Sequence, residues 1–210
     1  MIELLRRDLG ARDLPSVWAD MKRFTEERDA STPDELWFVD HPPVYTLGLN
    51  ADRRHLLEPG DVAVVPIDRG GQGTYHGPGQ LVAYVLLDLA RRGLGIRSLV
   101  ELLEQSVIDA VSGYGVRAQG RRDAPGVYVE GRKLAAIGLR VRRGCSYHGL
   151  AINVAMDLEP FARINPCGMA GLEVTQLEDL SGPVDFAKFR GEFEAALRLR
   201  LERYFSPAES

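Results

Sequence analysis

Three segments of the chain repeat their apolar residues at the spacing of an α-helix. In 14–28, 96–111 and 186–204, apolar side chains return every three or four residues, which places them on one face of a helix. Asp185 directly precedes the last segment, and its short carboxylate suits a helix N-cap. The pattern therefore predicts one helix near the start of the chain, one in the middle and one near the end.

Between these helices lie segments that are rich in β-branched and aromatic residues, as strands are. We predict seven strands: 35–41, 43–48, 62–68, 80–89, 126–131, 133–141 and 147–154. A turn at Glu130, Gly131 and Arg132 indicates a β-hairpin. Neighbouring strands with short connections pair mostly antiparallel, so we predict an α+β fold with a mixed, mostly antiparallel sheet flanked by helices. A single domain is expected over 1–205, with a loose tail over 206–210.

Composition and charge exclude several classes of protein. Hydrophobic residues make up 45% of the 210 residues and charged residues 27%, as in soluble globular proteins. The net charge of −4 argues against a nucleic-acid-binding domain. No apolar run approaches the roughly 20 residues that span a bilayer, and charges interrupt the first apolar residues, so we expect neither a membrane segment nor a signal peptide. Two cysteines do not make a secreted disulfide scaffold, and we expect a cytoplasmic protein with free thiols.

The segment "DRGGQGTYHGPGQL" (68–81) places five glycines between two strong strand segments. Glycine weakens regular structure and allows tight turns and close approach to a ligand. Arginine, glutamine, tyrosine and histidine stand among these glycines, which suits a binding loop better than a passive connection. The segment is not a nucleotide fingerprint, because His76 stands where G-x-G-x-x-G needs its last glycine, and the chain has no Gly-Lys-Ser/Thr.

The segment "GRKLAAIGLRVRRGCSYHGLAINV" (131–154) also carries unusual residues. Lys133 opens a strand in which small residues would leave room for an aliphatic substrate: Ala135, Ala136 and Gly138. Cys145 and His148 have a C-x-x-H spacing, but a zinc site needs about four ligands, and Cys167 is the only other cysteine. We therefore expect no metal, with Cys145 as a small buried residue and His148 as a polar residue of the groove.

In "RINPCGMAG" (163–171), Cys167 stands between a proline and a glycine. Proline fixes φ and glycine opens dihedrals closed to other residues, so the thiol is presented on a rigid turn. Backbone N–H groups near Gly168 can approach an oxyanion there. A cysteine attacks only as the thiolate and needs a cation or base beside it, for which Lys133, His76 and His148 are candidates.

Together these segments resemble the lipoyl (octanoyl) transferases. The resemblance runs in order through 69–89, 131–154 and 164–177, with shorter matches at 41–48 and 124–133. It implies a fold related to the catalytic domain of biotin and lipoate ligases. It also implies transfer of an octanoyl group from octanoyl-acyl carrier protein to a lysine of lipoyl domains, such as those of 2-oxoacid dehydrogenases or the glycine cleavage H protein, without a cofactor.

The resemblance assigns roles to particular residues. Cys167 and Lys133 match the catalytic dyad of the family, in which the cysteine carries the acyl group as a thioester. The residues that match the acyl pocket are Arg69, Gly70, Gly71, Gln72, Gly73, Thr74, Tyr75, His76, Ala136, Ile137, Gly138, His148, Gly149, Leu150 and Ala151.

A basic cluster follows the predicted groove in the sequence. Arg140, Arg142 and Arg143, with Arg69, are expected to form a local patch on this acidic protein that attracts acidic carrier proteins and lipoyl domains.

Three other functions compete with the transferase. An ATP-dependent lipoate or biotin ligase of the same fold would not need Cys167. A thioesterase would use the same dyad with water as the acceptor. A non-catalytic acyl-binding module would keep its function when Cys167 is replaced.

Overall fold

The computed structural model describes residues 3–205, without the side chains of Cys167 and Phe205. The predicted tail over 206–210 lies outside the described residues. Seven strands form the main sheet, which is antiparallel except for its first pair, β1 and β2. In sheet order the strands are β1 (Leu4–Ala11), β2 (Asp34–Asp40), β6 (Gln80–Leu86), β10 (Cys145–Asn153), β9 (Arg132–Arg142), β8 (Gly126–Val129) and β7 (Gln119–Gly120).

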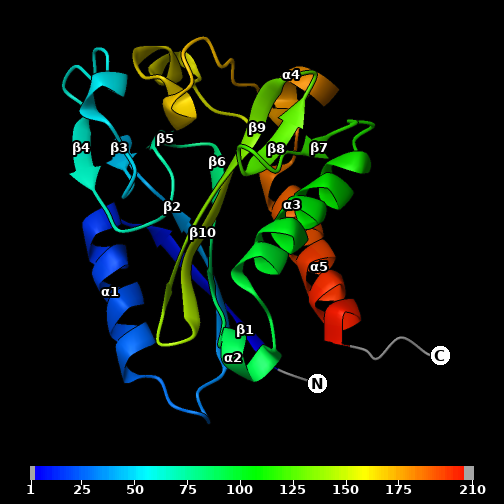
Figure 1. Cartoon of the computed structure of the whole chain (residues 1–210). Helices are drawn as coiled ribbons and strands as arrows, with labels where there is room; N and C mark the ends of the chain where they lie inside the picture. Colours follow the sequence, from blue (N-terminus) through cyan, green and yellow to red (C-terminus); the bar gives the residue numbers. More distant parts are fainter. Residues whose placement is uncertain (1–2, 206–210) are drawn as a thin grey trace.

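Helices cover both faces of this sheet (Figure 1). Helix α1 (Leu14–Glu27) packs on one face, and α3 (Ile96–Ser112) and α5 (Phe186–Phe205) pack on the other. Successive residues of a strand point to opposite faces, so Leu36 of β2 joins the core under α3 and α5 while Trp37 joins the core under α1. Because both faces are buried, β6 is apolar along nearly its whole length, and the middle of β2 is apolar from Leu36 to Val39.

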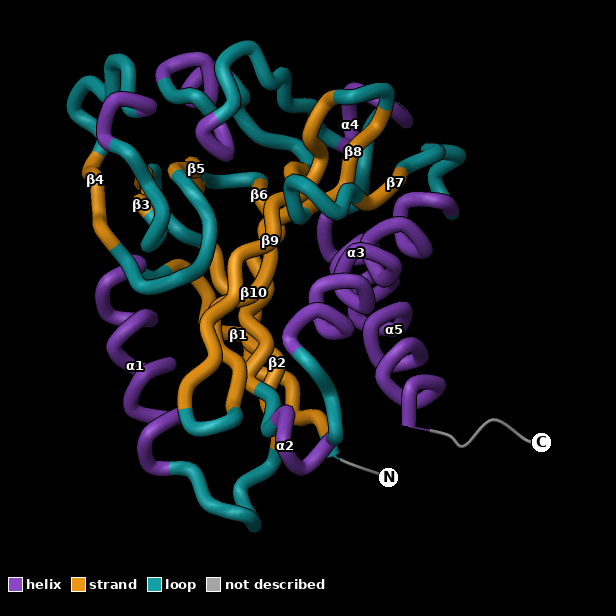
Figure 2. The backbone as a smooth tube through the Cα atoms, viewed as in Figure 1, coloured by secondary structure: helices purple, strands orange, loops and turns teal. Residues whose placement is uncertain are grey.

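A second sheet of three strands lies on the same side of the main sheet as α1 (Figure 2). Its order is β4 (Ala63–Pro66), β3 (Val44–Leu47) and β5 (Gly73–His76), with β3 parallel to β4 and antiparallel to β5. The sequence predicted a single sheet. Strand β5 was missed because it lies inside the glycine-rich segment, where its pairing with β3 supplies the hydrogen bonds that local propensity does not favour.

The predicted helices and the α+β class are confirmed. The carboxylate of Asp185 accepts from the N–H of Lys188 at 3.0 Å and caps α5. Strand β1 was not predicted, because only Leu4 of its eight residues is buried and an edge strand needs no continuous apolar pattern. The shorter helices are α2 (Leu89–Arg92), α4 (Leu177–Ser181), η1 (Arg53–His55), η2 (Glu159–Arg163) and η3 (Pro166–Gly168).

The predicted hairpin joins β8 to β9, but its turn is shorter than expected. Glu130 and Gly131 both have positive φ, of 50° and 84°, as the two central residues of a type I′ turn require. Arg132 therefore already belongs to β9, where it pairs with Val129. Within residues 3–205, no helix is both long and apolar enough to cross a membrane.

Candidate functional site

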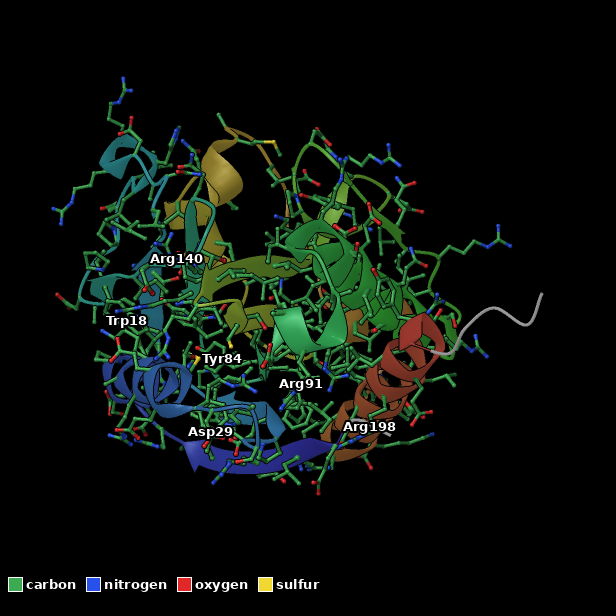
Figure 3. All side chains as sticks on the ribbon, turned by 60° about the horizontal axis from the view of Figure 1, so that its bottom comes forward. Trp18, Asp29, Tyr84, Arg91, Arg140 and Arg198 are labelled. Atoms are coloured by element: carbon green, nitrogen blue, oxygen red, sulfur yellow. The ribbon has the colours of Figure 1, made fainter. Side chains whose placement is uncertain are left out.

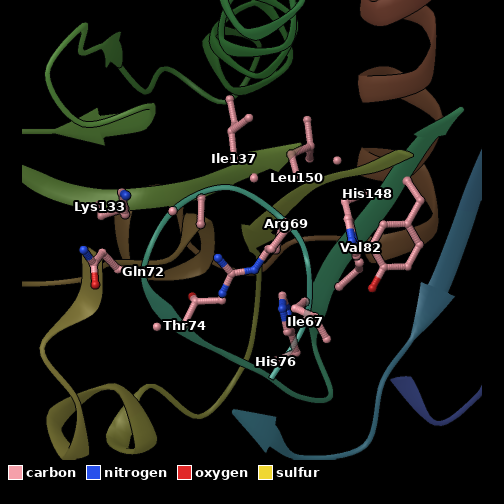
Figure 4. Close-up of a pocket in the computed structure, with 17 residues that line it drawn as sticks. Ile67, Arg69, Gln72, Thr74, His76, Val82, Lys133, Ile137, His148 and Leu150 are labelled. Atoms are coloured by element: carbon pink, nitrogen blue, oxygen red, sulfur yellow. The ribbon is translucent and has the colours of Figure 1, made fainter. Parts of the chain in front are cut away.

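A cavity lies between the main sheet and the glycine-rich segment (Figure 4). Strands β6, β9 and β10 form one wall, and residues 67–76 form the other. The space between these walls, including its open mouth, is about 540 Å³. Of the residues predicted to bind the acyl chain, all but Gly70 and Tyr75 line it. Figure 4 shows Lys133 and Gln72 at one end of the cavity and Val82 and His148 at the other.

Gly70 and Tyr75 hold the wall in place rather than facing the cavity. The N–H of Gly70 donates to the carbonyl of Leu139 at 2.9 Å, which ties the loop to β9. Side chains alternate along β5, so Tyr75 points away from the cavity and packs on Tyr45 and Phe161, with ring centroids 5.3 and 5.6 Å apart.

Sequence reasoning missed three residues of the wall: Ile67, Val82 and Tyr84. No local signal separates them from ordinary core residues. Tyr84 presents its ring to the cavity and its hydroxyl to the other side, where the oxygen lies 2.8 Å from Nε2 of His41. Nδ1 of His41 donates to the carbonyl of Arg12 at 2.7 Å, so Nε2 of the neutral ring accepts from Tyr84. The wall therefore stays apolar although it contains a tyrosine.

The side chain of Arg69 links the binding loop to β3. Its Nη2 donates to the carbonyl and the hydroxyl of Thr46 at 3.0 and 2.8 Å. A Cβ on Gly138 would lie 2.9 Å from Cδ of Arg69, so this glycine makes room for the arginine. The expectation that Arg69 contributes to a docking patch is wrong, since its side chain is buried and its guanidinium bonds within the protein.

The small residues of the predicted groove serve different purposes. Ala135 faces the core under α3 and α5, so it does not shape the cavity. A Cβ on Gly149 would overlap the carbonyl of Ala83, so Gly149 permits the close spacing of β10 and β6. Ala136 and Ala151 pair across β9 and β10 and line the cavity, where they leave space beside the sheet.

His76 is held as a neutral ring. Its Nδ1 lies 2.8 Å from Oε1 of Gln80, whose amide nitrogen donates to Tyr75 and Asn153. Nδ1 therefore carries the proton, and Nε2 faces the hydroxyl of Thr46 at 3.4 Å. Burial lowers the pKa of His76 to about 3. A ring with this pKa cannot hold an accepted proton at neutral pH, so His76 is a poor general base.

His148 is bound to the partly exposed carboxylate of Asp68 at the end of the cavity away from Lys133. Its φ is 61°, an uncommon value for a residue with a Cβ, and its Nε2 lies 2.9 Å from Asp68. Asp68 also accepts from the indole of Trp18 at 2.7 Å and from the hydroxyl of Tyr147. Burial raises the pKa of Asp68, but hydrogen bonds from His148 and Tyr147 bring it well below its usual range. Burial lowers the pKa of His148, against the opposing effect of Asp68.

Cys145 plays no part with His148. It lies at the start of β10, where it bridges to Asp88 and its sulfur is 3.7 Å from the carbonyl of Arg143. Among the side chains that the structure describes, no three His, Cys, Asp or Glu groups are placed to hold a metal ion.

These histidines predict acid sensitivity of the fold. Burial lowers the pKa of His41, His76 and His148, so below about pH 6.5 the unfolded chain binds protons that the folded chain does not. We expect the free energy of unfolding to be constant above pH 7. It should fall by about 1 kcal/mol between pH 6.5 and 5.5 for His76 alone, and further for the other two. Urea titrations at these pH values measure the free energy of unfolding. A free energy that does not change between pH 7 and 5.5 would contradict the conclusion that these buried histidines are neutral.

Lys133 is the second residue of β9, and its side chain is buried rather than solvated. Its Nζ lies 3.4 Å from the carbonyl of Pro125 and 5.2 Å from the ring centre of Tyr128. The carbonyl of Pro125 and the ring of Tyr128 are both suitable neighbours for this amino group and hold it at this end of the cavity.

The turn that carries Cys167 is the short helix η3, which lies next to the Lys133 end of the cavity. Gly168 has a φ of 70°, and a Cβ built on it would lie 3.2 Å from Cδ of Gln72, which lines the cavity. The chain then runs beside β9, where the N–H of Lys133 donates to Glu173 and the N–H of Thr175 donates to Lys133, both at 2.9 Å. The side chain of Cys167 lies outside the described part of the structure.

The basic cluster at 140–143 is not near this end of the cavity. Nine residues of β9 separate Arg142 from Lys133, about 30 Å along an extended strand, and Figure 1 shows that end of the hairpin at the opposite end of the molecule from η3. Arg142 pairs with Glu26 at 2.8 Å, and Arg143 donates to the carbonyl of Glu26 at 2.6 Å. The cluster therefore does not lie beside Lys133, and its role as a docking patch next to the groove stays a prediction.

Comparison with known proteins identifies the family. The lipoyl protein ligase A/B catalytic domain matches residues 13–198. An octanoyltransferase of Alkalilimnicola ehrlichii is 61% identical, over 89% of this chain and 86% of the relative. An octanoyltransferase of Pseudomonas fluorescens is 56% identical, over 97% of this chain and 93% of the relative.

Solved structures share the fold at low sequence identity. A putative lipoate protein ligase of T. acidophilum with bound lipoic acid is 15% identical and has a TM-score of 0.76, over 95% of this chain and 86% of its own. A biotin protein ligase of Aquifex aeolicus is 12% identical with a TM-score of 0.59, over 98% of this chain and 71% of its own. The predicted relation to these catalytic domains is confirmed. The chain belongs to the octanoyltransferases, a family of acyltransferases built on the lipoyl protein ligase A/B catalytic domain.

Proposed function

We propose that the protein transfers an octanoyl group from octanoyl-acyl carrier protein to the target lysine of lipoyl domains, through a thioester on Cys167. The observation that carries this proposal is the position of η3 beside the end of an apolar-walled cavity that also holds buried Lys133. The acceptors would be the lipoyl domains of 2-oxoacid dehydrogenases and the glycine cleavage H protein, in the cytoplasm, as the first step of protein lipoylation.

In the first half-reaction, Lys133 stands as the ammonium partner of the Cys167 thiolate. The thiolate attacks the carbonyl carbon of the octanoyl thioester. The N–H of Gly168 donates to the carbonyl of Asn165 at 3.0 Å, so it would stabilise the oxyanion only after it leaves this bond. The carbon–sulfur bond to phosphopantetheine breaks, and Lys133 gives its proton to the departing thiolate. One thioester replaces another, so the step needs no ATP.

In the second half-reaction, Lys133 is the neutral amine that the first step left behind. The neutral amino group of the target lysine attacks the acyl carbon, the bond to Cys167 breaks, and Lys133 accepts the proton that the new amide loses. The thiolate and ammonium pair is restored, so protons balance over the cycle. The pKa of about 3 for His76 and the bond of His148 to Asp68 both favour Lys133 as the proton acceptor.

Intact-protein mass spectrometry tests the proposal. After incubation with octanoyl-acyl carrier protein, we expect one octanoyl increment on the enzyme, and this increment should move to an added apo lipoyl domain without ATP. Loss of the increment to water at the same rate without the lipoyl domain would indicate a thioesterase. No increment, together with ATP-dependent modification of the lipoyl domain by free octanoate or lipoate, would indicate a ligase.

A further inference from the structure

One buried carboxylate near the candidate site has no role in the mechanism above. Glu104 lies on the buried face of α3, with only 7% of its surface exposed. Its Oε1 accepts from the N–H of Gly126 at 2.9 Å, and the N–H of Arg121 also donates to its carboxylate. Burial raises the pKa of Glu104, which these two hydrogen bonds and the charge of Lys133 oppose.

The carboxylate of Glu104 contacts both ends of the loop that connects β7 to β8. At the β7 end of this loop, a Cβ on Gly120 would lie 2.5 Å from Oε2 of Glu104, so the backbone passes directly over the carboxylate. At the β8 end, Gly126 donates to Oε1. Glu104 thus contacts both ends of residues 121–125 and sets the path of the loop between them.

This loop forms the surroundings of the Lys133 side chain. Pro125 supplies the carbonyl 3.4 Å from Nζ. Gly126 lies so close that a Cβ on it would be 3.0 Å from Cε and 3.3 Å from Nζ of the lysine. The ring of Tyr128, whose hydroxyl donates to Ala124 at 2.8 Å, lies under the ammonium group. The carboxylate therefore stands directly behind the residues that touch Lys133.

We propose that Glu104 is a positioning residue for the acyl transfer, which fixes the loop at Pro125 and Gly126 and whose buried negative charge holds the amino group of Lys133 in place as the partner of the Cys167 thiolate. The inference rests on the proposed function of the Cys167 and Lys133 pair. A glutamine at this position keeps one oxygen for the N–H of Gly126 but carries no charge, and its amide nitrogen donates where the second carboxylate oxygen accepts. Replacement by glutamine therefore tests the charge.

The other charges around this group do not replace Glu104. Glu101 lies one turn earlier on α3, is half-exposed and pairs with Arg97 at 3.8 Å. The side chain of Arg121 turns outward to Asp123, while its guanidinium carbon lies 5.1 Å from the ring centre of Tyr128. On β9, Arg132 pairs with Glu130 at the surface. Beside Lys133 on the adjacent segment, Glu173 contributes its backbone carbonyl.

The pH dependence of the alkylation of Cys167 by iodoacetamide tests the inference, with peptide mass spectrometry to separate Cys167 from buried Cys145. In Glu104→Gln, loss of the charge should move the alkylation midpoint to higher pH by about one unit, which makes alkylation at pH 7 about tenfold slower. Glu101→Gln is the matched control on the same helix and should keep the wild-type midpoint. In a Lys133→Met background, Glu104→Gln should no longer shift the midpoint.

Glu104→Asp keeps the charge and shortens the reach to Gly126. It should lower Tm yet keep a midpoint near that of the wild type, and it serves the test if Glu104→Gln does not fold. A wild-type midpoint in Glu104→Gln with only a lower Tm, or a raised midpoint in Glu104→Asp, would overturn the inference. Alkylation needs no octanoyl donor, so a failure to form the octanoyl adduct with the midpoint shift intact would count against the proposed function alone.

Discussion

Replacing Cys167 by serine is expected to abolish the octanoyl adduct and to lower the transfer rate by roughly 10⁴-fold or more, the scale of removing a nucleophile in other covalent enzymes. A serine hydroxyl at this position keeps the turn between Pro166 and Gly168 but lacks a thiolate. The measurement is the single-turnover rate from octanoyl-acyl carrier protein to an apo lipoyl domain, together with intact mass. A serine variant that retains the rate would leave the dyad mechanism untenable.

Substitutions of Lys133 separate its two roles. Lys133→Ala should lose both half-reactions, because it removes the cation and the proton carrier together. Lys133→Arg keeps a cation beside the thiol but cannot exchange its proton near neutral pH. We therefore expect Lys133→Arg to retain rapid alkylation of Cys167 while discharge to the lipoyl domain is strongly slowed. Retention of both alkylation and discharge in the arginine variant would show that Lys133 acts only through its charge.

Replacing Asp34 by alanine should lower the free energy of unfolding by about 3–5 kcal/mol. Asp34 is completely buried at the start of β2 and accepts from Arg28 at 2.7 Å, Arg91 at 2.8 Å and Arg92 at 2.5 Å. Figure 3 shows Arg91 at the end of the molecule where α2 lies. The side chains of Arg28 and Arg92 are only 3% and 2% exposed, so the alanine variant leaves two buried cations without their counter-charge.

A matched control exists in the same chain. Asp20 also pairs with two arginines, Arg12 at 2.9 Å and Arg23 at 2.6 Å, but its side chain is 24% exposed. Surface ion pairs contribute little, so Asp20→Ala should cost less than about 1 kcal/mol. Urea and thermal unfolding compare the two, and Asp34→Ala should lower Tm by roughly 10 °C. Equal costs in the two variants would contradict the importance of burial for the Asp34 cluster.

Local patterns in the sequence determined the elements and most of the chemistry. The three long helices follow from periodicity, and the hairpin follows from the residues around Gly131. Most residues that line the cavity were predicted from the resemblance of 69–76, 136–138 and 148–151 to the octanoyltransferases. The helices and the hairpin depend on neighbours within a few residues, so a linear pattern contains the information for them.

Tertiary structure alone decided which of these residues perform which task. Gly138 makes room for Arg69, Gly149 permits close spacing of strands, and Arg69 is buried. In the sequence, these glycines look like positions that leave room for a ligand. The atoms that a Cβ would strike belong to distant segments, so only the folded chain shows why glycine is needed there. Strand β1 was missed for a similar reason. It is an edge strand whose pairing with β2 holds it in place, and it has no apolar pattern of its own.

The surroundings of the catalytic pair are non-local as well. Lys133 meets the chain after Cys167 through the pairing with 173–175, and Glu104 reaches the Lys133 loop from a helix on the other face of the sheet. The extended path of β9 also places Arg142 about 30 Å along the strand from Lys133, which it follows closely in the sequence. A buried charge depends on what packs around it, and only the folded chain determines that.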